Sequence, residues 1–275
     1  MKKWKKNLYE NEGYPDNYTD VTFLDELRKN VNVENVSFRC AVLGAGLVTQ
    51  EICTVVLFAV VFVYLYNEWI NPETVLFQSS IITALGYIIH RILGTSDSYY
   101  STLVKDLRTV LIFLVFGYVL SPILKTLTDT ISTDTIFAMS TLMMIIHIVF
   151  FDYGVPAGIV SSALSLNAAI FGSICLASRL ASAFHAFVLL TITVECFALL
   201  PLLLARIKNS LLLLTAVVMV VLYALYTVSI TMAVLFACVI TFITLLCPYL
   251  FLRWQSYKDN IYGPWDEAVV HDEDM

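Results

Sequence analysis

Long apolar runs constrain this chain more than any other feature of its sequence. Between residues 41 and 252 they follow one another with only short polar interruptions. A membrane-spanning helix needs about 20 predominantly apolar residues. The hydrophobic share of 59% and the charged share of 14% are also far from the roughly 45–50% and 25% of soluble domains. We therefore predict an all-α integral membrane protein, a bundle of about eight transmembrane helices. The predicted spans are 41–66, 74–93, 107–124, 136–151, 157–177, 183–204, 210–230 and 231–252.

The spans divide the chain into three parts. Residues 1–40 form a polar head, residues 41–252 a polytopic helical membrane domain, and residues 253–275 a short tail. The head has no apolar core of the kind that marks a cleaved signal. No soluble segment reaches the size of an enzyme domain. The net charge of −6 gives no support for nucleic-acid binding.

The positive charges predict the orientation. With the N-terminus in the cytosol, fourteen of the sixteen Lys and Arg residues fall on the cytosolic side, and only Lys125 and Arg179 fall on the lumenal side. Loops on the cytosolic side of membrane proteins carry an excess of Lys and Arg. We therefore expect both termini to be cytosolic.

Several titratable residues lie in or near the spans. Glu51 and Glu195 are each expected to be protonated or hydrogen-bonded to a neighbouring helix, with use in a proton relay or in catalysis as the alternative. His90, His147 and His185 lie near span ends and match no metal-binding spacing, so we interpret them as interfacial or packing residues. The six cysteines make no C-x-x-C pair and are interpreted as packing residues.

Small residues recur at intervals of three and four along the fifth span, among them Ser165 and Gly172. Such a stripe lets another helix backbone come close. Asn167 lies on the opposite side and also needs a polar partner, so we expect this helix to have neighbours all round. A lipid or substrate groove is the alternative interpretation.

Polar residues in two connecting segments have both structural and functional interpretations. Lys125 and Asp129 are four apart and could pair on a helical turn, while Asp134 is placed to cap the span that follows. Asp152, in FFDYG, is expected to stabilise a turn. The alternative for the loop 125–135 is contact with a partner subunit. Basic residues near positions 90–108 either follow the positive-inside rule or hold the phosphate of an inositol lipid.

Several longer motifs point to one family. They are YPDNYTD (14–20), FLDELRKN (23–30), FHAF (184–187) and GPWDEA (263–268), and the match runs from about Trp4 to Ala268. The chain resembles the phosphatidylinositol glycan class C family. The resemblance implies a multi-spanning subunit of a complex in the endoplasmic reticulum membrane. That complex transfers N-acetylglucosamine from UDP-N-acetylglucosamine to phosphatidylinositol, the first step of GPI-anchor biosynthesis. In the family, catalysis is attributed to a partner subunit with a soluble nucleotide-sugar domain.

The motifs that the chain lacks agree with that division of labour. It has no D-x-D, no G-x-x-x-x-G-K-[ST] and no Gly-rich turn after a predicted strand. We therefore predict a non-catalytic subunit without a cofactor. Its expected partners are the other subunits, including the catalytic glycosyltransferase, with phosphatidylinositol as a further candidate. Candidate contact residues for a partner or a lipid are Lys125, Asp129, Asp134, Asp152, Asn167, Arg179, Trp265 and Asp266. In the tail, Trp265 is the expected anchor of a cytosolic contact with a partner, and a position at the bilayer surface is the alternative interpretation.

Two alternatives belong to other functional classes. An integral-membrane glycosyltransferase using a lipid-linked donor would place a carboxylate such as Asp129 or Asp134 in the lumen, but the usual large lumenal domain is not recognisable here. A lipid scramblase or transporter would use Glu51, Glu195 and Pro201 within the spans. The lack of a detectable internal repeat counts against this second alternative.

Overall fold

The computed structural model describes most of the membrane domain and isolated parts of the head and tail. The described residues are 36–93, 99–154, 160–207 and 211–255, with residues 15, 18, 28, 29, 257, 261 and 262. Asn17, Asn35, Trp265 and Asp266 lie outside these residues. The interpretations that rest on them therefore stay predictions.

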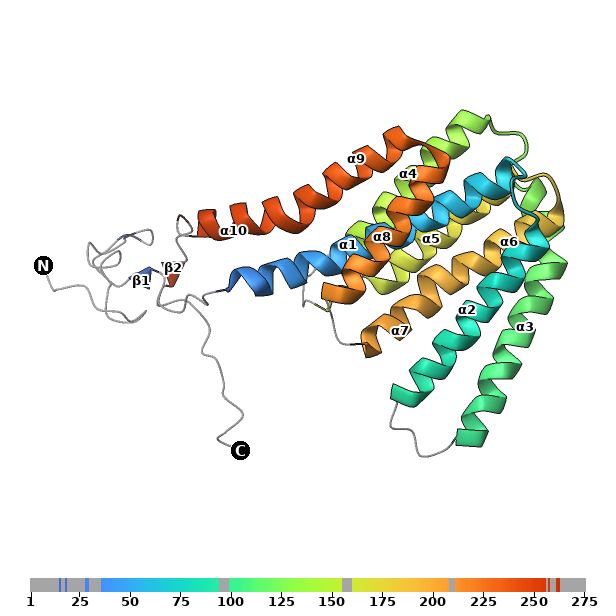
Figure 1. The fold of residues 1–275 in the computed structure, drawn as a ribbon, viewed down its shortest axis with the longest axis horizontal. Coiled ribbons are helices and arrows are strands. Elements are labelled where there is room, and N and C mark those ends of the chain that lie inside the picture. The colour runs from blue at the N-terminus through green and yellow to red at the C-terminus, as the bar shows by residue number, and fades with distance from the viewer. Residues whose placement is uncertain are drawn as a thin grey trace, which may run out of the picture. The chain divides into compact units, whose positions relative to one another are not determined.

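Eight helical segments account for the eight predicted spans. Two of the segments are continuous helices with a π turn inside (Figure 1). The segments are α1 (Phe38–Tyr66), α2 (Pro72–Leu93), α3 (Tyr99–Thr126), α4 (Thr133–Phe150), α5 (Ser162–Ala177), α6–η2–α7 (Ala183–Val194, Glu195–Leu199, Leu200–Arg206), α8 (Leu211–Val228) and α9–η3–α10 (Ile230–Thr241, Phe242–Leu246, Cys247–Gln255). Among the described residues, six segments are long and apolar enough to cross a membrane, while α5 and α8 are shorter apolar helices. The prediction of an all-α membrane bundle is confirmed.

Serine residues determine where three of the helices begin. The Ser132 hydroxyl accepts a hydrogen bond from the Thr135 amide, so α4 begins at Thr133. Ser161 does the same for the Leu164 amide, and α5 begins at Ser162 rather than at the predicted residue 157. Both contacts satisfy an N–H group that has no partner inside its helix. Between α8 and α9, Ser229 alone has an extended backbone conformation, and it makes the whole turn.

Each π turn ends two residues before a proline. The segment η2 ends at Leu199, before Pro201, and η3 ends at Leu246, before Pro248. Proline has no N–H group, and its ring collides with the carbonyl four residues earlier. The wider turn moves that carbonyl aside, and the Leu200 N–H bonds the Glu195 carbonyl five residues back. The helix therefore continues past Pro201 with its side-chain positions rotated.

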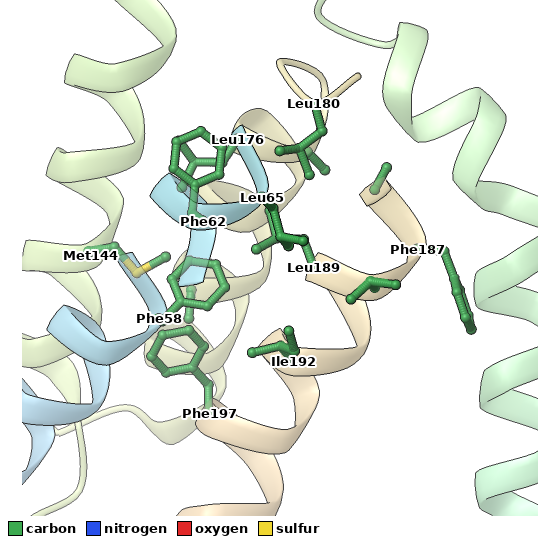
Figure 2. Close-up of a cluster of buried hydrophobic side chains, with 14 residues drawn as sticks. Phe58, Phe62, Leu65, Met144, Leu176, Leu180, Phe187, Leu189, Ile192 and Phe197 are labelled. Carbon is green, nitrogen blue, oxygen red and sulfur yellow. The ribbon is translucent and has the colours of Figure 1, made fainter. Parts of the chain in front are cut away.

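The apolar core joins α1 to two groups of helices. On one side, Phe58, Phe62 and Leu65 of α1 pack with Leu189 and Phe197, in a cluster to which α4 and α5 also contribute (Figure 2). The rings of Phe58 and Phe197 meet edge to face, with centroids 5.2 Å apart. On the other side, Cys53 and Val60 of α1 join a cluster of side chains from α8 and α9. Because α1 contributes to both clusters, it is the central helix of the bundle.

The α4–α5 contact is the most extensive between two helices of the described residues. Ser165, Ala168, Ala169, Gly172 and Ser173 are all buried, as the small-residue pattern predicted. The Ser140 hydroxyl donates to the Gly172 carbonyl over 3.1 Å. A Cβ on Gly172 would lie 3.2 Å from the Met143 Cβ, so only glycine fits this approach without displacement. This face of α5 is a helix-packing surface and not a groove.

Residues 1–38 and 249–275 form a second compact unit, apart from residues 39–248. In it, β1 (Arg28–Lys29) pairs antiparallel with β2 (Ile261–Tyr262). Arg28 lies opposite Tyr262, and Lys29 lies opposite Ile261. The head and the tail, which we expected as separate segments, are thus joined by main-chain hydrogen bonds between the motif FLDELRKN (23–30) and the two residues directly before the motif GPWDEA (263–268).

Candidate functional site

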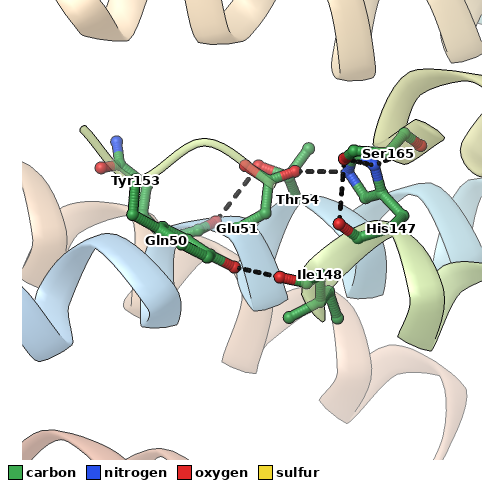
Figure 3. A network of polar contacts seen from close by, with 7 residues as sticks. All are labelled: Gln50, Glu51, Thr54, His147, Ile148, Tyr153 and Ser165. Atoms are coloured by element: carbon green, nitrogen blue, oxygen red, sulfur yellow. Dashed lines mark hydrogen bonds and ion pairs between the residues drawn. The ribbon is translucent and has the colours of Figure 1, made fainter. Parts of the chain in front are cut away.

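A buried network of polar side chains connects α1, α4 and α5. The His147 Nε2 atom lies 2.8 Å from Glu51 Oε1, and the Nδ1 atom of the same ring lies 2.8 Å from the Ser165 hydroxyl (Figure 3). Glu51 is 3% exposed, His147 1% and Ser165 2%. The expectation that Glu51 bonds a neighbouring helix is confirmed. His147 is a buried packing residue as well as the partner of Glu51.

The acceptors around His147 determine where its protons lie. Nδ1 is 3.0 Å from the Ser165 carbonyl, which can only accept, so Nδ1 carries a proton. The Ser165 hydroxyl can donate to the His147 carbonyl at 2.9 Å. One further proton then lies between Nε2 and the Glu51 carboxyl group. Whichever of the two atoms holds it, the pair has no net charge, which suits burial in a membrane helix bundle.

Aromatic and amide groups surround this pair. The Phe197 ring centroid lies 4.8 Å from that of His147 and covers the imidazole edge to face. Gln50 is also buried, and its Nε2 group has no hydrogen-bond partner among the described residues. In the link after α4, Tyr153 donates to the Ile148 carbonyl over 2.8 Å. Burial raises the pKa of the Tyr153 phenol, and the nearby Glu51 raises it further, so the hydroxyl remains a donor.

The second carboxyl group of the spans, Glu195, lies at the start of the π turn η2. The side chains of Ser79 and Thr83 on α2 lie beside it, and the Ser79 hydroxyl donates to the Leu76 carbonyl over 3.2 Å. Both predicted carboxyl groups therefore face polar side chains of a neighbouring helix, Glu51 on α4 and Glu195 on α2. Each contact fixes the rotation of one helix against another.

The candidate residues Lys125 and Arg179 each bond a main-chain carbonyl in a neighbouring turn. Lys125 Nζ donates to the Ala181 carbonyl over 2.7 Å. Arg179 donates through Nη2 to the Thr128 carbonyl and through Nε to the Ser178 hydroxyl, the latter over 3.1 Å. These cations tie the α3–α4 turn to the α5–α6 turn. The expected Lys125–Asp129 pair does not form, because α3 ends at Thr126 and Asp129 is no longer on its helical turn.

The other described candidates are exposed, and two of them differ from expectation. Asp134 lies in the first turn of α4, where a carboxylate is favourable, but Ser132 is the cap. Asn167 is exposed, so α5 lacks the expected neighbour on that side among the described residues. Asp152 accepts a hydrogen bond from the Gly154 amide over 2.9 Å, and Gly154 has φ +77°, which favours glycine. Asp152 thus stabilises a turn, as predicted. Asp129 is also exposed.

Basic residues cluster where α2 ends and α3 begins. Arg91 lies over the Tyr87 ring, with 5.9 Å between its guanidinium carbon and the ring centroid. The Tyr87 hydroxyl donates to Asp106 over 2.8 Å. Sequence reasoning passed over Asp106, although a lone carboxylate between Lys105 and Arg108 was the available signal. It also missed the pairing of Glu51 with His147, because residues 96 positions apart give no spacing signal.

The fold and the buried network define a polytopic helical membrane protein whose interior polar groups hold helices together. Comparison with known proteins narrows this class. A family model described as phosphatidylinositol N-acetylglucosaminyltransferase matches residues 4–266. The chain belongs to this family, in agreement with the resemblance seen in the sequence.

The chain is similar to named relatives over nearly its full length. A human protein named as a subunit of phosphatidylinositol N-acetylglucosaminyltransferase is 40% identical, over 98% of this chain and 94% of the relative. The putative subunit of the same enzyme in Dictyostelium discoideum is 38% identical, over 98% and 80%. The GPI2 subunit of the Schizosaccharomyces pombe enzyme is 33% identical, over 98% and 87%. No solved structure matches this chain.

Proposed function

We propose that this chain is a non-catalytic membrane subunit of the complex that transfers N-acetylglucosamine from UDP-N-acetylglucosamine to phosphatidylinositol, the first step of GPI-anchor biosynthesis. The observation that carries the proposal is the similarity to proteins named as subunits of this transferase, which extends over 98% of the chain. Its site of action would be the endoplasmic reticulum membrane.

The hydrogen-bond partners of the polar side chains support a structural role for the bundle. Glu51, His147 and Ser165 bond one another, and Glu195 lies beside the hydroxyl side chains of Ser79 and Thr83 on α2. Lys125 and Arg179 bond main-chain carbonyls of neighbouring turns. A catalytic acid, base or nucleophile needs access to a reacting atom. In this chain these groups hold helices and turns in place instead.

The subunit would act by holding the catalytic glycosyltransferase and the other subunits at the membrane. The exposed residues Asp129, Asp134 and Asn167 remain candidates for these contacts. Trp265 and Asp266 in the tail remain candidates too, with both termini in the cytosol. Presentation of phosphatidylinositol to the catalytic subunit is a second part of the proposed role.

A reconstitution experiment tests the proposal. The chain is purified alone, and also with its partners through a tag placed on this chain. Sugar transfer from UDP-N-acetylglucosamine to phosphatidylinositol is then measured in liposomes. We expect transfer from the purified complex and none from the single chain. Turnover by the single chain, with its partners shown to be absent, would contradict a non-catalytic role, while failure to recover any transferase subunit would contradict membership of the complex.

A further inference from the structure

Among the described candidate spans, α2 combines two properties that conflict in a lipid environment. Its most apolar window has the lowest mean hydropathy of the six long spans, and none of that window is buried. A helix that faces lipid is expected to be the most apolar of a bundle, because lipid tails cannot bond polar groups. Among the six described spans, α2 thus has both the lowest mean hydropathy and the smallest buried share.

The polar residues of α2 divide between two faces. Ser79 and Thr83 are half-buried and lie beside Glu195. Gln78 is exposed, and it has no hydrogen-bond partner among the described residues. The described residues therefore supply a polar neighbour to the inner face of α2 and none to the outer amide.

The depth of Gln78 makes this costly. The 22 residues of α2 extend about 33 Å, close to the thickness of the hydrocarbon layer. Gln78 lies six residues after Pro72, or about 9 Å along the helix axis. At that depth a carboxamide finds few polar groups in lipid, and burying one without a partner is unfavourable.

Apolar residues continue the Gln78 face at helical spacing. Ile82, Leu85, Ile89 and Ile92 follow at intervals of three and four, and all four are exposed, with Ile82 at 70% and Ile92 at 76%. Residues spaced in this way line one face of a helix. We call the face formed by Gln78, Ile82, Leu85, Ile89 and Ile92 the outer face of α2.

We propose that the outer face of α2 binds a transmembrane helix of another subunit of the same transferase, and that this helix carries a hydrogen-bonding side chain at the depth of Gln78. The inference rests on the proposed function, because relatives of the chain are named as subunits of that enzyme. Side chains that hydrogen-bond between helices are a recognised means of association in membranes. A partner helix would satisfy the amide and would also cover the four aliphatic residues.

Substitution of Gln78 separates this role from a structural one. Gln78→Leu removes an exposed amide from a membrane helix, so the purified single chain should unfold in detergent at the wild-type temperature or above it. Recovery of the partner subunits through a tag on this chain should fall roughly threefold to fifteenfold, the range for loss of one interhelical hydrogen bond. Tyr223→Leu on α8, where the tyrosine is 72% exposed, is the matched control and should leave recovery unchanged.

Photo-crosslinking identifies the occupant. A photoreactive amino acid is placed at Ile82 and, as a control, at Tyr223, and the crosslinked products are identified by mass spectrometry. We expect a crosslink from Ile82 to a membrane-spanning subunit of the transferase, and loss of this crosslink when Leu85→Trp fills the outer face. Crosslinks to lipid alone, or to a second copy of this chain, would overturn the inference.

The outcomes also distinguish the inference from the proposed function. If Gln78→Leu and Leu85→Trp both keep full recovery of the partner subunits, the outer face is not the interface, although the chain remains a subunit. If even the wild-type chain recovers no transferase subunit, the proposed function fails with it.

Discussion

The interior around α1 and the outer face of α2 differ in whether their polar side chains have hydrogen-bond partners among the described residues. In the interior, Glu51, His147 and Ser165 bond one another across three helices, and each is almost fully buried. On α2, the Gln78 amide is exposed and has no partner in the described chain. An unbonded polar group is costly in a membrane. The interior residues are therefore interpreted as stabilising this subunit, and Gln78 as the residue that we propose is bonded by another subunit.

The largest expected effect comes from breaking the interior pair. Glu51→Leu or His147→Leu leaves a buried polar partner unpaired, and each should cost about 3–5 kcal/mol. We expect a strong loss of monodisperse protein in mild detergent and a clearly lower unfolding temperature. Wild-type behaviour of both variants would show that the interior does not depend on this pair.

Glu51→Gln is the matched control for these substitutions. The amide of glutamine can still donate to His147 Nε2, because Nδ1 carries the ring proton that bonds the Ser165 carbonyl. This variant should therefore be much closer to wild type than Glu51→Leu. If the two variants are equally unstable, the proton arrangement described here is wrong.

A smaller effect is expected at the α4–α5 contact. Gly172→Leu places side-chain atoms against Met143, Met144 and the Ser140 carbonyl, all within 3.4 Å of the new Cβ. Overpacking of this kind costs about 1–3 kcal/mol, which should appear as a lower unfolding temperature and lower yield. Gly44→Leu in α1 is the control, since no atom lies within 4 Å of its Cβ. Equal losses for both variants would point to a general effect of added bulk.

A still smaller loss of stability is expected at the turns that join α3 to α4 and α5 to α6. Arg179→Ala removes the bonds to the Thr128 carbonyl and the Ser178 hydroxyl and should cost about 1 kcal/mol, measured by thermal unfolding. Asp129→Ala, at an exposed position in the same turn region, should change stability by less than about 0.5 kcal/mol. A larger loss from Asp129→Ala would restore the ion pair with Lys125 that the sequence suggested.

No effect at all is expected at two possible glycosylation sites. Asn17-Tyr18-Thr19 and Asn35-Val36-Ser37 fit the N-glycosylation pattern, but in the orientation that we propose the head lies in the cytosol and does not meet the lumenal enzymes. Asn17→Gln and Asn35→Gln should therefore leave electrophoretic mobility unchanged, with and without glycosidase treatment. A glycosidase-sensitive shift would reverse the orientation proposed for the whole bundle.

The spans were predictable from the sequence because hydrophobic length is a local property. All eight helical segments appear where apolar runs lie, and most boundaries differ by only a few residues. Helix starts were less predictable, since a serine cap such as Ser161 competes with a continuing apolar pattern. The buried stripe of α5 was also predictable, because small residues at helical spacing favour close packing of helices in a membrane.

The partners of polar residues were not predictable, because they depend on which helices meet. Glu51 was expected to bond some neighbour, but nothing in the spacing identified His147. Lys125 lies four residues before Asp129, yet it bonds Ala181, since helix α3 ends in between. For Asn167, the sequence indicated the need for a neighbour, but the part of the chain that the structure describes does not supply it.

The pairing of β1 with β2 has a consequence for the order of events during synthesis. Arg28 and Lys29 are made before the first span, whereas Ile261 and Tyr262 follow the last of the described spans. The two strands therefore cannot meet until every described span has been made. Such a long-range contact forms late. A product that is truncated before β2 contains all of these spans but cannot form the pair.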